Sequence, residues 1–246
     1  MGELIAVLSG KGGTGKTSVC AGVATALAMS GKRILCIDCD VGLRNLDISL
    51  GLSDSGALSF LEVCRGDYPL EQAMPHPLFP TLCFLTAPMN CPAEAIDRAS
   101  FGEMLAKARE KFDYIFLDAP AGVDAGFRLV STYADRCIVV TGPGPAAVRD
   151  VTRAGELLEL MGKTNIRMVV NRVTPKMAEA METTVDDVMD AAGLPLLGVI
   201  PEDLNMTLAA AFGQPLLRYR KRTPAAKACI RIANRILGLP EPMKLR

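Results

Sequence analysis

The sequence lacks any uncharged apolar run near the ~20 residues that a membrane-spanning helix needs, although half of its 246 residues are hydrophobic. It also lacks the basic N-terminal stretch and cleavage site of a secretory signal peptide, and a strand-like segment begins almost at once. No linker divides the chain, and no internal repeat occurs. These absences predict a cytoplasmic protein with one domain over residues 1–246.

The cysteines do not form the paired pattern of a metal site. Eight of them are scattered over strand-like and helix-like segments, which predicts reduced thiols in a cytosolic core. Only one Cys-x-x-Cys pair occurs, at Cys36 and Cys39, on a predicted strand. Residues three apart on a strand point to opposite faces, so these two thiols are not expected to share a metal.

The chain has one histidine, and it stands outside any catalytic pattern. His76 lies between two prolines in a predicted loop, which favours a surface residue over a catalytic one. Met177, Met181 and Met189 are expected to pack in helices and not to line a cofactor site.

What the sequence does contain is a phosphate-binding loop at residues 10–18, GKGGTGKTS in one-letter code. It follows an apolar run and precedes an alanine-rich helical stretch. Its glycines let backbone N–H groups turn toward phosphate oxygens at a helix N-terminus. Lys16 can reach the β- and γ-phosphates and Thr17 can offer its hydroxyl to Mg²⁺, so a nucleoside triphosphate is the predicted ligand. The predicted nucleotide-binding residues of the loop are Gly12, Gly13, Thr14, Gly15, Lys16, Thr17 and Ser18.

Carboxylates follow two apolar strands beside this loop. Asp38 and Asp40 end one strand-like segment, and Asp118 ends another in the manner of a Walker B aspartate. One such aspartate alone would be as consistent with a helix cap or a turn. Three beside a phosphate-binding loop predict the oxygen ligands and water-positioning group of a Mg²⁺–nucleotide site.

Strand-like and helix-like stretches alternate along the chain. Segments such as 114–117 and 137–140 are apolar on both faces, as buried parallel strands are. The alternation predicts an α/β fold, a P-loop NTPase domain whose mostly parallel sheet has helices on both faces and ligands at the strands' carboxyl ends. The expected strands are 3–9, 33–38, 82–87, 113–118, 136–141, 166–171 and 196–200, and the expected helices are 16–30, 56–65, 100–111, 125–133, 145–161, 183–192, 204–212 and 224–237.

The chain has no net charge, but its charges are unevenly distributed. Residues 214–246 hold nine basic residues and one acidic residue, a net charge of +8, so the preceding residues carry −8. Lys227, Arg231 and Arg235 recur at four-residue spacing on one face of the basic last helix. This pattern fits a polyanionic partner, either a membrane surface or nucleic acid, as well as it fits a solvated helix face.

The full loop resembles the deviant Walker A motif of the MinD/ParA family of ATPases, because a second lysine, Lys11, directly follows its first glycine. Residues 40–47, DVGLRNLD, and 118–123, DAPAGV, resemble the two switch segments of the family's septum-site-determining branch more than those of plasmid-type ParA. Residues 147–150 and 198–203 match as well. The resemblance runs from about residue 3 to about residue 238.

The resemblance implies that the chain binds ATP and Mg²⁺ and forms a homodimer around two ATP molecules. In the expected catalytic set, Lys11 would reach the partner's nucleotide, Lys16 would bind phosphates and Asp40 would orient the attacking water. The further residues implied are Thr17, Asp38 and Asp118 for the metal, Asn171 for the adenine edge, and Arg172, Pro201 and Asp203 around the base.

The function implied is an ATP-dependent dimerisation switch that hydrolyses ATP to ADP and phosphate and helps to place the division septum. Its expected partners are a division inhibitor and an ATPase-stimulating protein, with peripheral contact at the inner face of the cell membrane. The alternatives are a ParA-type ATPase that partitions DNA, a flagellar-placement ATPase and, less favoured, an iron–sulfur carrier ATPase. The eight residues after 238 include two prolines, so the amphipathic membrane helix of related proteins is expected to be absent or reduced.

Overall fold

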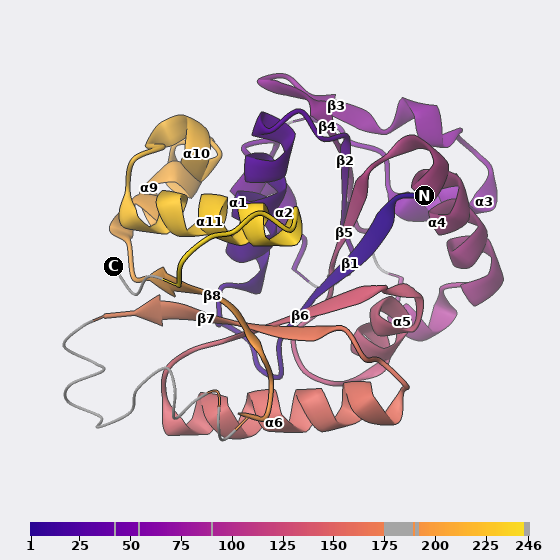
Figure 1. Ribbon diagram of the computed structural model, residues 1–246. Helices are drawn as coiled ribbons and strands as arrows, with labels where there is room; N and C mark the ends of the chain where they lie inside the picture. The colour runs from indigo at the N-terminus through magenta and orange to yellow at the C-terminus, as the bar shows by residue number, and fades with distance from the viewer. Residues whose placement is uncertain (42, 54, 90, 175–188, 190–191, 244–246) are drawn as a thin grey trace.

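The computed structural model describes the chain except for residues 42, 54, 90, 175–188, 190–191 and 244–246. Its centre is one eight-stranded sheet in the order β3-β4-β2-β5-β1-β6-β7-β8 (Figure 1). All neighbouring strands pair in parallel except β3 and β4, which are antiparallel. The strands are β1 (Glu3–Leu8), β2 (Ile34–Asp38), β3 (Met74–His76), β4 (Phe79–Leu85), β5 (Tyr114–Asp118), β6 (Arg136–Thr141), β7 (Ile166–Val173) and β8 (Leu196–Pro201).

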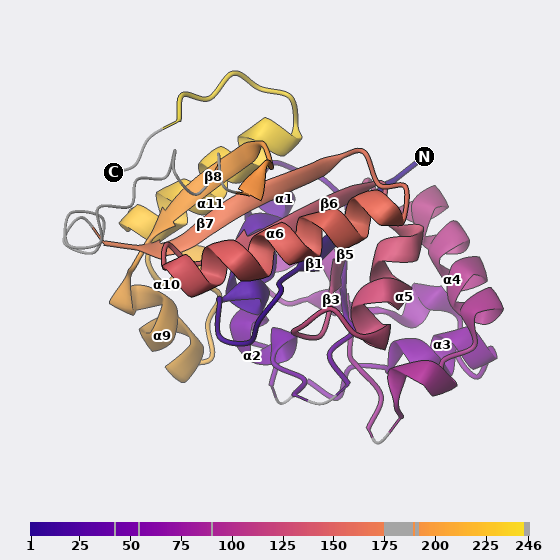
Figure 2. The same cartoon turned by 90° about the horizontal axis from the view of Figure 1, so that it is seen from below.

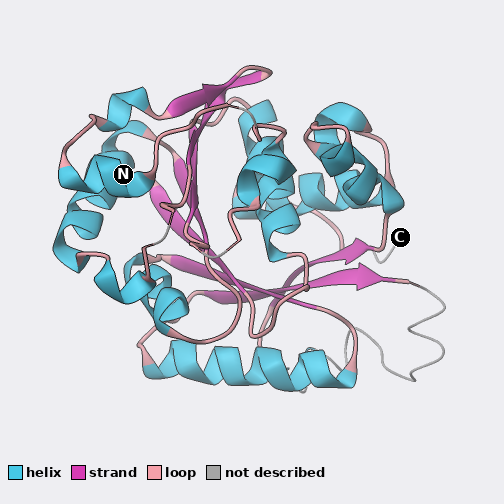
Figure 3. Ribbon diagram, turned by 180° about the vertical axis from the view of Figure 1, so that it is seen from behind, coloured by secondary structure: helices cyan, strands magenta, loops and turns pink. Residues whose placement is uncertain are grey.

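Helices cover both faces of this sheet, as Figures 2 and 3 show. On one face lie α1 (Lys16–Met29), α2 (Leu46–Leu50), α9 (Leu204–Ala211), α10 (Leu216–Tyr219) and α11 (Pro224–Ile236). On the other lie α3 (Phe60–Arg65), α4 (Arg98–Lys111), α5 (Ala125–Tyr133) and α6 (Pro145–Leu160). Two short 3₁₀ helices occur at Leu70–Gln72 and Ala93–Ala95. The predicted α/β fold is therefore confirmed.

The central strands are apolar throughout because each face of the sheet packs against its own core. In β1, Leu4, Ala6 and Leu8 point into one core, whereas Ile5 and Val7 point into the other. This two-residue alternation is the geometry of a strand. Helices on both faces leave no solvated side, so the sequence reads as a continuous apolar run.

Besides the two 3₁₀ helices, the described residues contain short elements that the sequence does not predict, namely β3, α2 and α10, each of five residues or fewer. Segments this short carry no readable periodicity. The helix predicted at 56–65 begins later, at Phe60, because Ser59 and Glu62 form a capping box in which each side chain accepts the other's backbone N–H. Most of the helix predicted at 183–192 lies outside the described residues.

His76 is a buried residue, so its predicted surface position is wrong. Its side chain is only 1% exposed, in β3 at the edge of the sheet. Nε2 lies 2.8 Å from the Leu50 carbonyl oxygen, and Nδ1 accepts a hydrogen bond from the Leu78 backbone N–H at 3.0 Å. Burial is tolerated because both ring nitrogens of the neutral imidazole are hydrogen-bonded.

The sulfur-containing residues largely follow expectation. Cys36 and Cys39 lie in different cores, on opposite faces of the sheet, so their two thiols cannot coordinate one metal ion together. Met189 packs against the core as predicted, whereas Met177 and Met181 lie outside the described residues.

The basic face expected on the last helix, α11, is only partly open to solvent. Lys227 is exposed, but Arg235 donates to the carbonyl oxygens of Leu197 and Pro242, each at 2.8 Å. Arg235 thus ties the residues after the helix to α11 and to the edge strand β8, and it does not belong to an open basic surface. Among the helices that are described, none is long and apolar enough to cross a membrane.

Candidate functional site

The candidate site lies where the central strands β1, β2 and β5 end. The phosphate-binding loop joins β1 to the N-terminus of α1, and β1 pairs with β5 on one side. Asp38 and Asp118 are the last residues of the adjacent strands β2 and β5 and are direct partners in the sheet register. The fold thereby places both predicted carboxylates beside the loop, as the sequence analysis expects.

The loop needs glycine at specific points. Gly13 and Gly15 have φ angles of 80° and 84°, a left-handed conformation that residues with a Cβ adopt rarely. A Cβ at Gly15 would collide with the Asn171 amide, and one at Gly10 would collide with the Asp150 carbonyl. Among the described residues, no acceptor is bonded to the backbone N–H groups of residues 12–15, which leaves these donors available to a ligand.

Lys16 forms a buried ion pair with Asp118. The Nζ atom lies 2.7 Å from Asp118 Oδ1, and the two side chains are 6% and 1% exposed. Burial alone would lower the pKa of Lys16, but the attraction and hydrogen bond of Asp118 outweigh it and raise that pKa. The pKa of Asp118 is raised by its own burial, against the opposing effect of Lys16. Lys16 Nζ also lies 3.4 Å from Thr17 Oγ1.

Asp38 holds the segment that resembles the first switch. Its Oδ1 accepts the Asp40 backbone N–H at 2.9 Å, and its Oδ2 accepts the Leu46 N–H at 3.1 Å. Asp38 thereby fixes both ends of the turn that leads into α2 and keeps Asp40 beside the loop. Burial, followed by repulsion from Asp118, raises the pKa of Asp38 to about 7. Its role toward the metal stays a prediction.

In the described part of the chain, four buried side-chain polar atoms have no hydrogen-bond partner, and three of them belong to residues at or beside the loop. These three are Asp118 Oδ2, Thr14 Oγ1 and Asn171 Oδ1. Buried polar atoms in proteins are nearly always paired, so orphans concentrated at one loop fit a polar ligand there. Among the described residues, no three His, Cys, Asp or Glu side chains converge to hold a metal ion. Mg²⁺ at nucleotide sites is usually held by one or two carboxylates together with phosphate oxygens and waters, and strand-end aspartates beside a phosphate-binding loop fit that pattern.

The residues predicted around the base share one cavity beside the loop, with a volume of about 290 Å³. Asp203 occupies its wall as a double helix cap, because its oxygens accept the backbone N–H groups of Asn205 and Ala225 at 3.0 and 3.1 Å. Burial would raise the pKa of Asp203, but the hydrogen bond from the Asn205 side chain, together with these backbone bonds, lowers it overall. The lining residues are Gly15, Ser18, Asn171, Arg172, Pro201, Glu202, Asp203, Met206, Thr207 and Ala210.

The end of β7 also contacts the phosphate-binding loop directly, which the sequence analysis does not predict. Asn171 Nδ2 donates to the Thr14 carbonyl oxygen at 2.8 Å, and Arg172 Nη1 donates to the Gly13 carbonyl oxygen at 3.1 Å. No local sequence pattern announces these contacts, because they join residues more than 150 positions apart.

Lys11 differs from Lys16, the other predicted catalytic lysine, in its exposure to solvent. Its side chain is exposed, and among the described residues it has no ion-pair partner. Its backbone carbonyl oxygen accepts a hydrogen bond from the Ser9 hydroxyl at 3.0 Å. An exposed lysine in the phosphate-binding loop is available to contact a group outside this chain.

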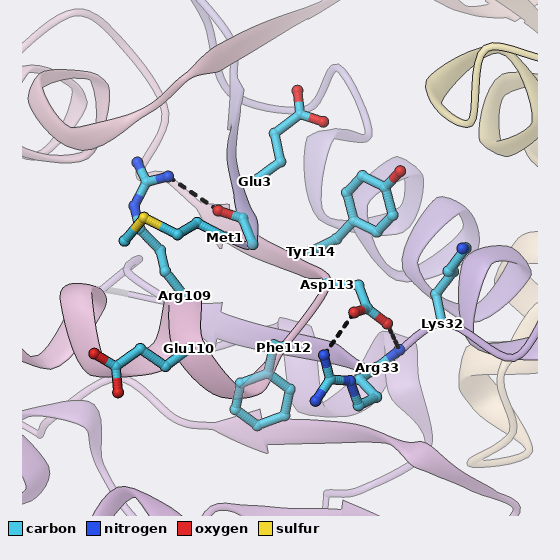
Figure 4. A pocket seen from close by; sticks show the side chains of 10 residues that line it. Met1, Glu3, Lys32, Arg33, Arg109, Glu110, Phe112, Asp113 and Tyr114 are labelled. Atoms are coloured by element: carbon cyan, nitrogen blue, oxygen red, sulfur yellow. Dashed lines mark hydrogen bonds and ion pairs between the residues drawn. The ribbon is translucent and has the colours of Figure 1, made fainter.

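A larger cavity, about 540 Å³, lies at the opposite edge of the sheet, beside the amino ends of β1 and β5 (Figure 4). Some of the charged groups that line it are already engaged, by each other or by the backbone. Arg33 bonds to Asp113 at 2.8 Å, and Arg109 donates to the Gly2 carbonyl oxygen at 3.0 Å. Ligands of open α/β sheets bind at the carboxyl ends, so this cavity is not the candidate site.

A glycine loop between a buried strand and a helix, a buried lysine and strand-end carboxylates define the P-loop class of nucleotide-binding protein. Residues 5–216 match the family model described as the CobQ/CobB/MinD/ParA nucleotide binding domain. The chain therefore belongs to this family, whose MinD/ParA members are ATPases, and the expected membership is confirmed.

Similar proteins place the chain near the MinD branch. It is 36% identical to the septum site-determining protein MinD of Synechocystis sp., over 98% of this chain and 92% of that one. It is also 36% identical to MinD of Bacillus subtilis, over 100% and 92%.

Solved structures agree with these sequence matches. The MinC:MinD cell division protein complex of Aquifex aeolicus matches with a TM-score of 0.90 and 34% identity over 98% of both chains. MinD of Pyrococcus horikoshii, complexed with Mg-ADP, matches with a TM-score of 0.84 and 29% identity over 96% of both chains. A ParA family ATPase from Chlorobium tepidum shares the fold, at 20% identity.

Proposed function

We propose that this chain is an ATP-dependent dimerisation switch that hydrolyses ATP to ADP and phosphate and helps to place the division site. The observation that carries the proposal is the buried Lys16–Asp118 pair at the phosphate-binding loop, with the second oxygen of Asp118 left unpartnered. The similarity to MinD proteins over nearly the whole chain supports the division-site role. We also propose that residues 1–246 act as one domain.

The triphosphate would lie in the cradle of residues 12–18, with its base in the cavity lined by Asn171, Arg172, Pro201 and Asp203. The free Oδ1 of buried Asn171 would accept from the adenine amino group. Thr17, Asp38 and Asp118 would support Mg²⁺, which supplies positive charge against the phosphate oxygens. The orphaned oxygen of Asp118 favours this assignment.

Binding would change the partner of Lys16. In the structure its ammonium is neutralised by Asp118, and β- and γ-phosphates within reach would compete for the same charge. Once Lys16 turns to the phosphates, both oxygens of Asp118 become available to the metal shell. Asp40 is held next to this centre by its backbone bond to Asp38, and its carboxylate would orient the attacking water.

Two such chains would meet around two nucleotides. The exposed Lys11 of the phosphate-binding loop would contact the partner's phosphates and neutralise charge that develops during hydrolysis. Dimerisation would then require ATP, because without it the cradles and lysines of two chains repel each other.

Partners follow from similarity and charge. The likeness to the MinC:MinD complex supports a division inhibitor as a partner, and a stimulating protein would set the hydrolysis rate. Exposed basic residues of α10, α11 and the turn between them would make peripheral contact with the inner face of the cell membrane, and the protein would otherwise act in the cytoplasm. DNA would be the partner under the less favoured ParA-type function.

The proposal is tested by phosphate release and light-scattering mass measurement on the purified protein, with ATP, ADP or no nucleotide. We expect Mg²⁺-dependent release and a dimer with ATP alone, both abolished in Lys16→Ala. A monomer in all three conditions, with no phosphate release, would refute the proposal.

A further inference from the structure

The end of β7 holds the outer side of the phosphate-binding loop. In such a loop the backbone N–H groups face the phosphates, so its carbonyl groups must face outward and need donors of their own. Two successive carbonyls find them here. Asn171 Nδ2 bonds to the Thr14 oxygen at 2.8 Å, and Arg172 Nη1 bonds to the Gly13 oxygen at 3.1 Å.

Arg172 is itself fixed by the end of the neighbouring strand. Its Nε lies 3.0 Å from Glu202 Oε2 and its Nη2 lies 3.5 Å from Oε1, directly after β8. The Glu202 backbone N–H in turn donates to the Val173 carbonyl at 3.1 Å. One guanidinium therefore links β7, β8 and the loop, which uses the planar fork that distinguishes arginine from lysine.

The backbone of Arg172 is unusual as well. Its φ is 62°, and among the described non-glycine residues only Arg44 shares a positive φ. Such a conformation persists where surrounding contacts determine it, and it is typical of functional sites. Here it lets consecutive residues, Asn171 and Arg172, bond to consecutive loop carbonyls.

We infer that Arg172, oriented by Glu202, is a positioning residue for the phosphate-binding loop, and that its role is to hold the Gly13 carbonyl outward and not to read the base. The inference rests on the proposed nucleotide binding. It differs from the role around the base that the resemblance implies, because the guanidinium bonds that the structure shows go to the loop and to Glu202. It predicts that Arg172 acts on the phosphate part of the ligand.

The test separates the phosphates from the base by using Mg²⁺–tripolyphosphate beside Mg²⁺–ATP. Isothermal titration calorimetry would measure the affinity of each ligand for the wild type and for three variants, Arg172→Ala, Arg172→Lys and Glu202→Gln. We expect Arg172→Ala to weaken both by a similar factor, about tenfold for the loss of a charge-assisted hydrogen bond. Arg172→Lys should recover part of the lost affinity, because an ammonium reaches one acceptor but cannot bridge both. Glu202→Gln should have an affinity between those of the wild type and Arg172→Ala. Arg65→Ala, an exposed arginine on α3, is the matched control.

Different results would overturn the inference. Weaker ATP binding with unchanged tripolyphosphate binding in Arg172→Ala would assign Arg172 to the base. Unchanged binding of both would remove any role at the loop. If Arg172→Ala fails to fold, as circular dichroism would report, Arg172→Lys and Glu202→Gln carry the same comparison. A wild type that binds neither ligand would instead refute the proposed nucleotide binding, and the inference with it.

Discussion

Lys16 Nζ and Asp118 Oδ1 lie 2.7 Å apart in the interior, where water screens neither charge. The two residues are 102 positions apart in sequence and meet only because β1 and β5 are neighbours in the sheet. A buried pair of this kind is a poor source of net stability but is costly to break from one side. We therefore interpret the pair functionally: Asp118 neutralises the Lys16 ammonium until a phosphate replaces it.

Removing one partner of this pair should destabilise the protein, and bound nucleotide should offset the loss. Asp118→Asn leaves the Lys16 ammonium buried without a counter-charge, which should lower the free energy of unfolding by about 3 kcal/mol in urea titrations. Mg²⁺–ATP should recover much of it by supplying negative charge to Lys16. Asp113→Asn breaks the exposed pair with Arg33 and should cost less than about 1 kcal/mol. Equal losses in the two variants would contradict a special role for the buried pair.

Hydrolysis and binding should separate in two variants at the same site. Asp40→Ala should nearly abolish phosphate release while ATP binding persists, and the ATP-bound dimer should accumulate, because the water loses its orienting carboxylate. Lys16→Ala should lose phosphate affinity itself. Equilibrium binding of a fluorescent ATP analogue, measured beside phosphate release, distinguishes them. Wild-type turnover in Asp40→Ala would remove the proposed role.

Lys11→Ala should bind ATP and yet remain monomeric and inactive, because its exposed side chain is expected to serve the partner's nucleotide and not its own. Light scattering with saturating ATP measures the mass, and Lys107→Ala, which removes an exposed lysine on α4, is the control. An ATP-dependent dimer of normal stability in Lys11→Ala would make Lys11 an ordinary loop lysine.

The raised pKa of Asp38, about 7, predicts a specific pH dependence. An unfolded chain releases this proton near its ordinary pKa of about 4, so between the two values the folded state binds more protons and stability falls as pH rises. The fall should end above pH 7 or so, with a slope of at most about 1.4 kcal/mol per pH unit. Urea unfolding from pH 4.5 to 8 should show it in the wild type and a flatter line in Asp38→Asn. Identical slopes would contradict the shift.

The sequence predicts the loop, the strand-end aspartates and the sheet, because each is encoded within a few consecutive residues. It does not predict the bonds of Asn171 and Arg172 to the loop or the burial of His76, because these depend on which strands become neighbours. His76 shows the difference clearly, since two flanking prolines indicate a loop, yet the ring is buried against Leu50, 26 positions earlier. Local sequence patterns identify the residues that would bind the ligand, whereas the tertiary structure determines which distant side chains position them.

The basic surface predicts salt-sensitive binding to anionic partners. Arg235 is tied to β8 and to the residues after α11. Among the described residues of this basic segment, the exposed cations are therefore Arg218, Arg220, Lys221, Arg222 and Lys227. Near an anionic membrane each is worth at most about 1 kcal/mol, and screening over about 8 Å at physiological salt weakens this further. An ATP dimer would double the surface, so recruitment should follow nucleotide state.

Co-sedimentation with anionic liposomes, and separately with DNA, at low and high salt with ATP or ADP, measures this recruitment. Reversing charge at Arg220 and Lys221 to glutamate should abolish it, whereas reversing Arg65 on α3 should not. Liposome binding that survives high salt would show that an inserted apolar segment holds the protein and that these cations do not. Absence of binding to either surface with ATP would leave them as solvated side chains.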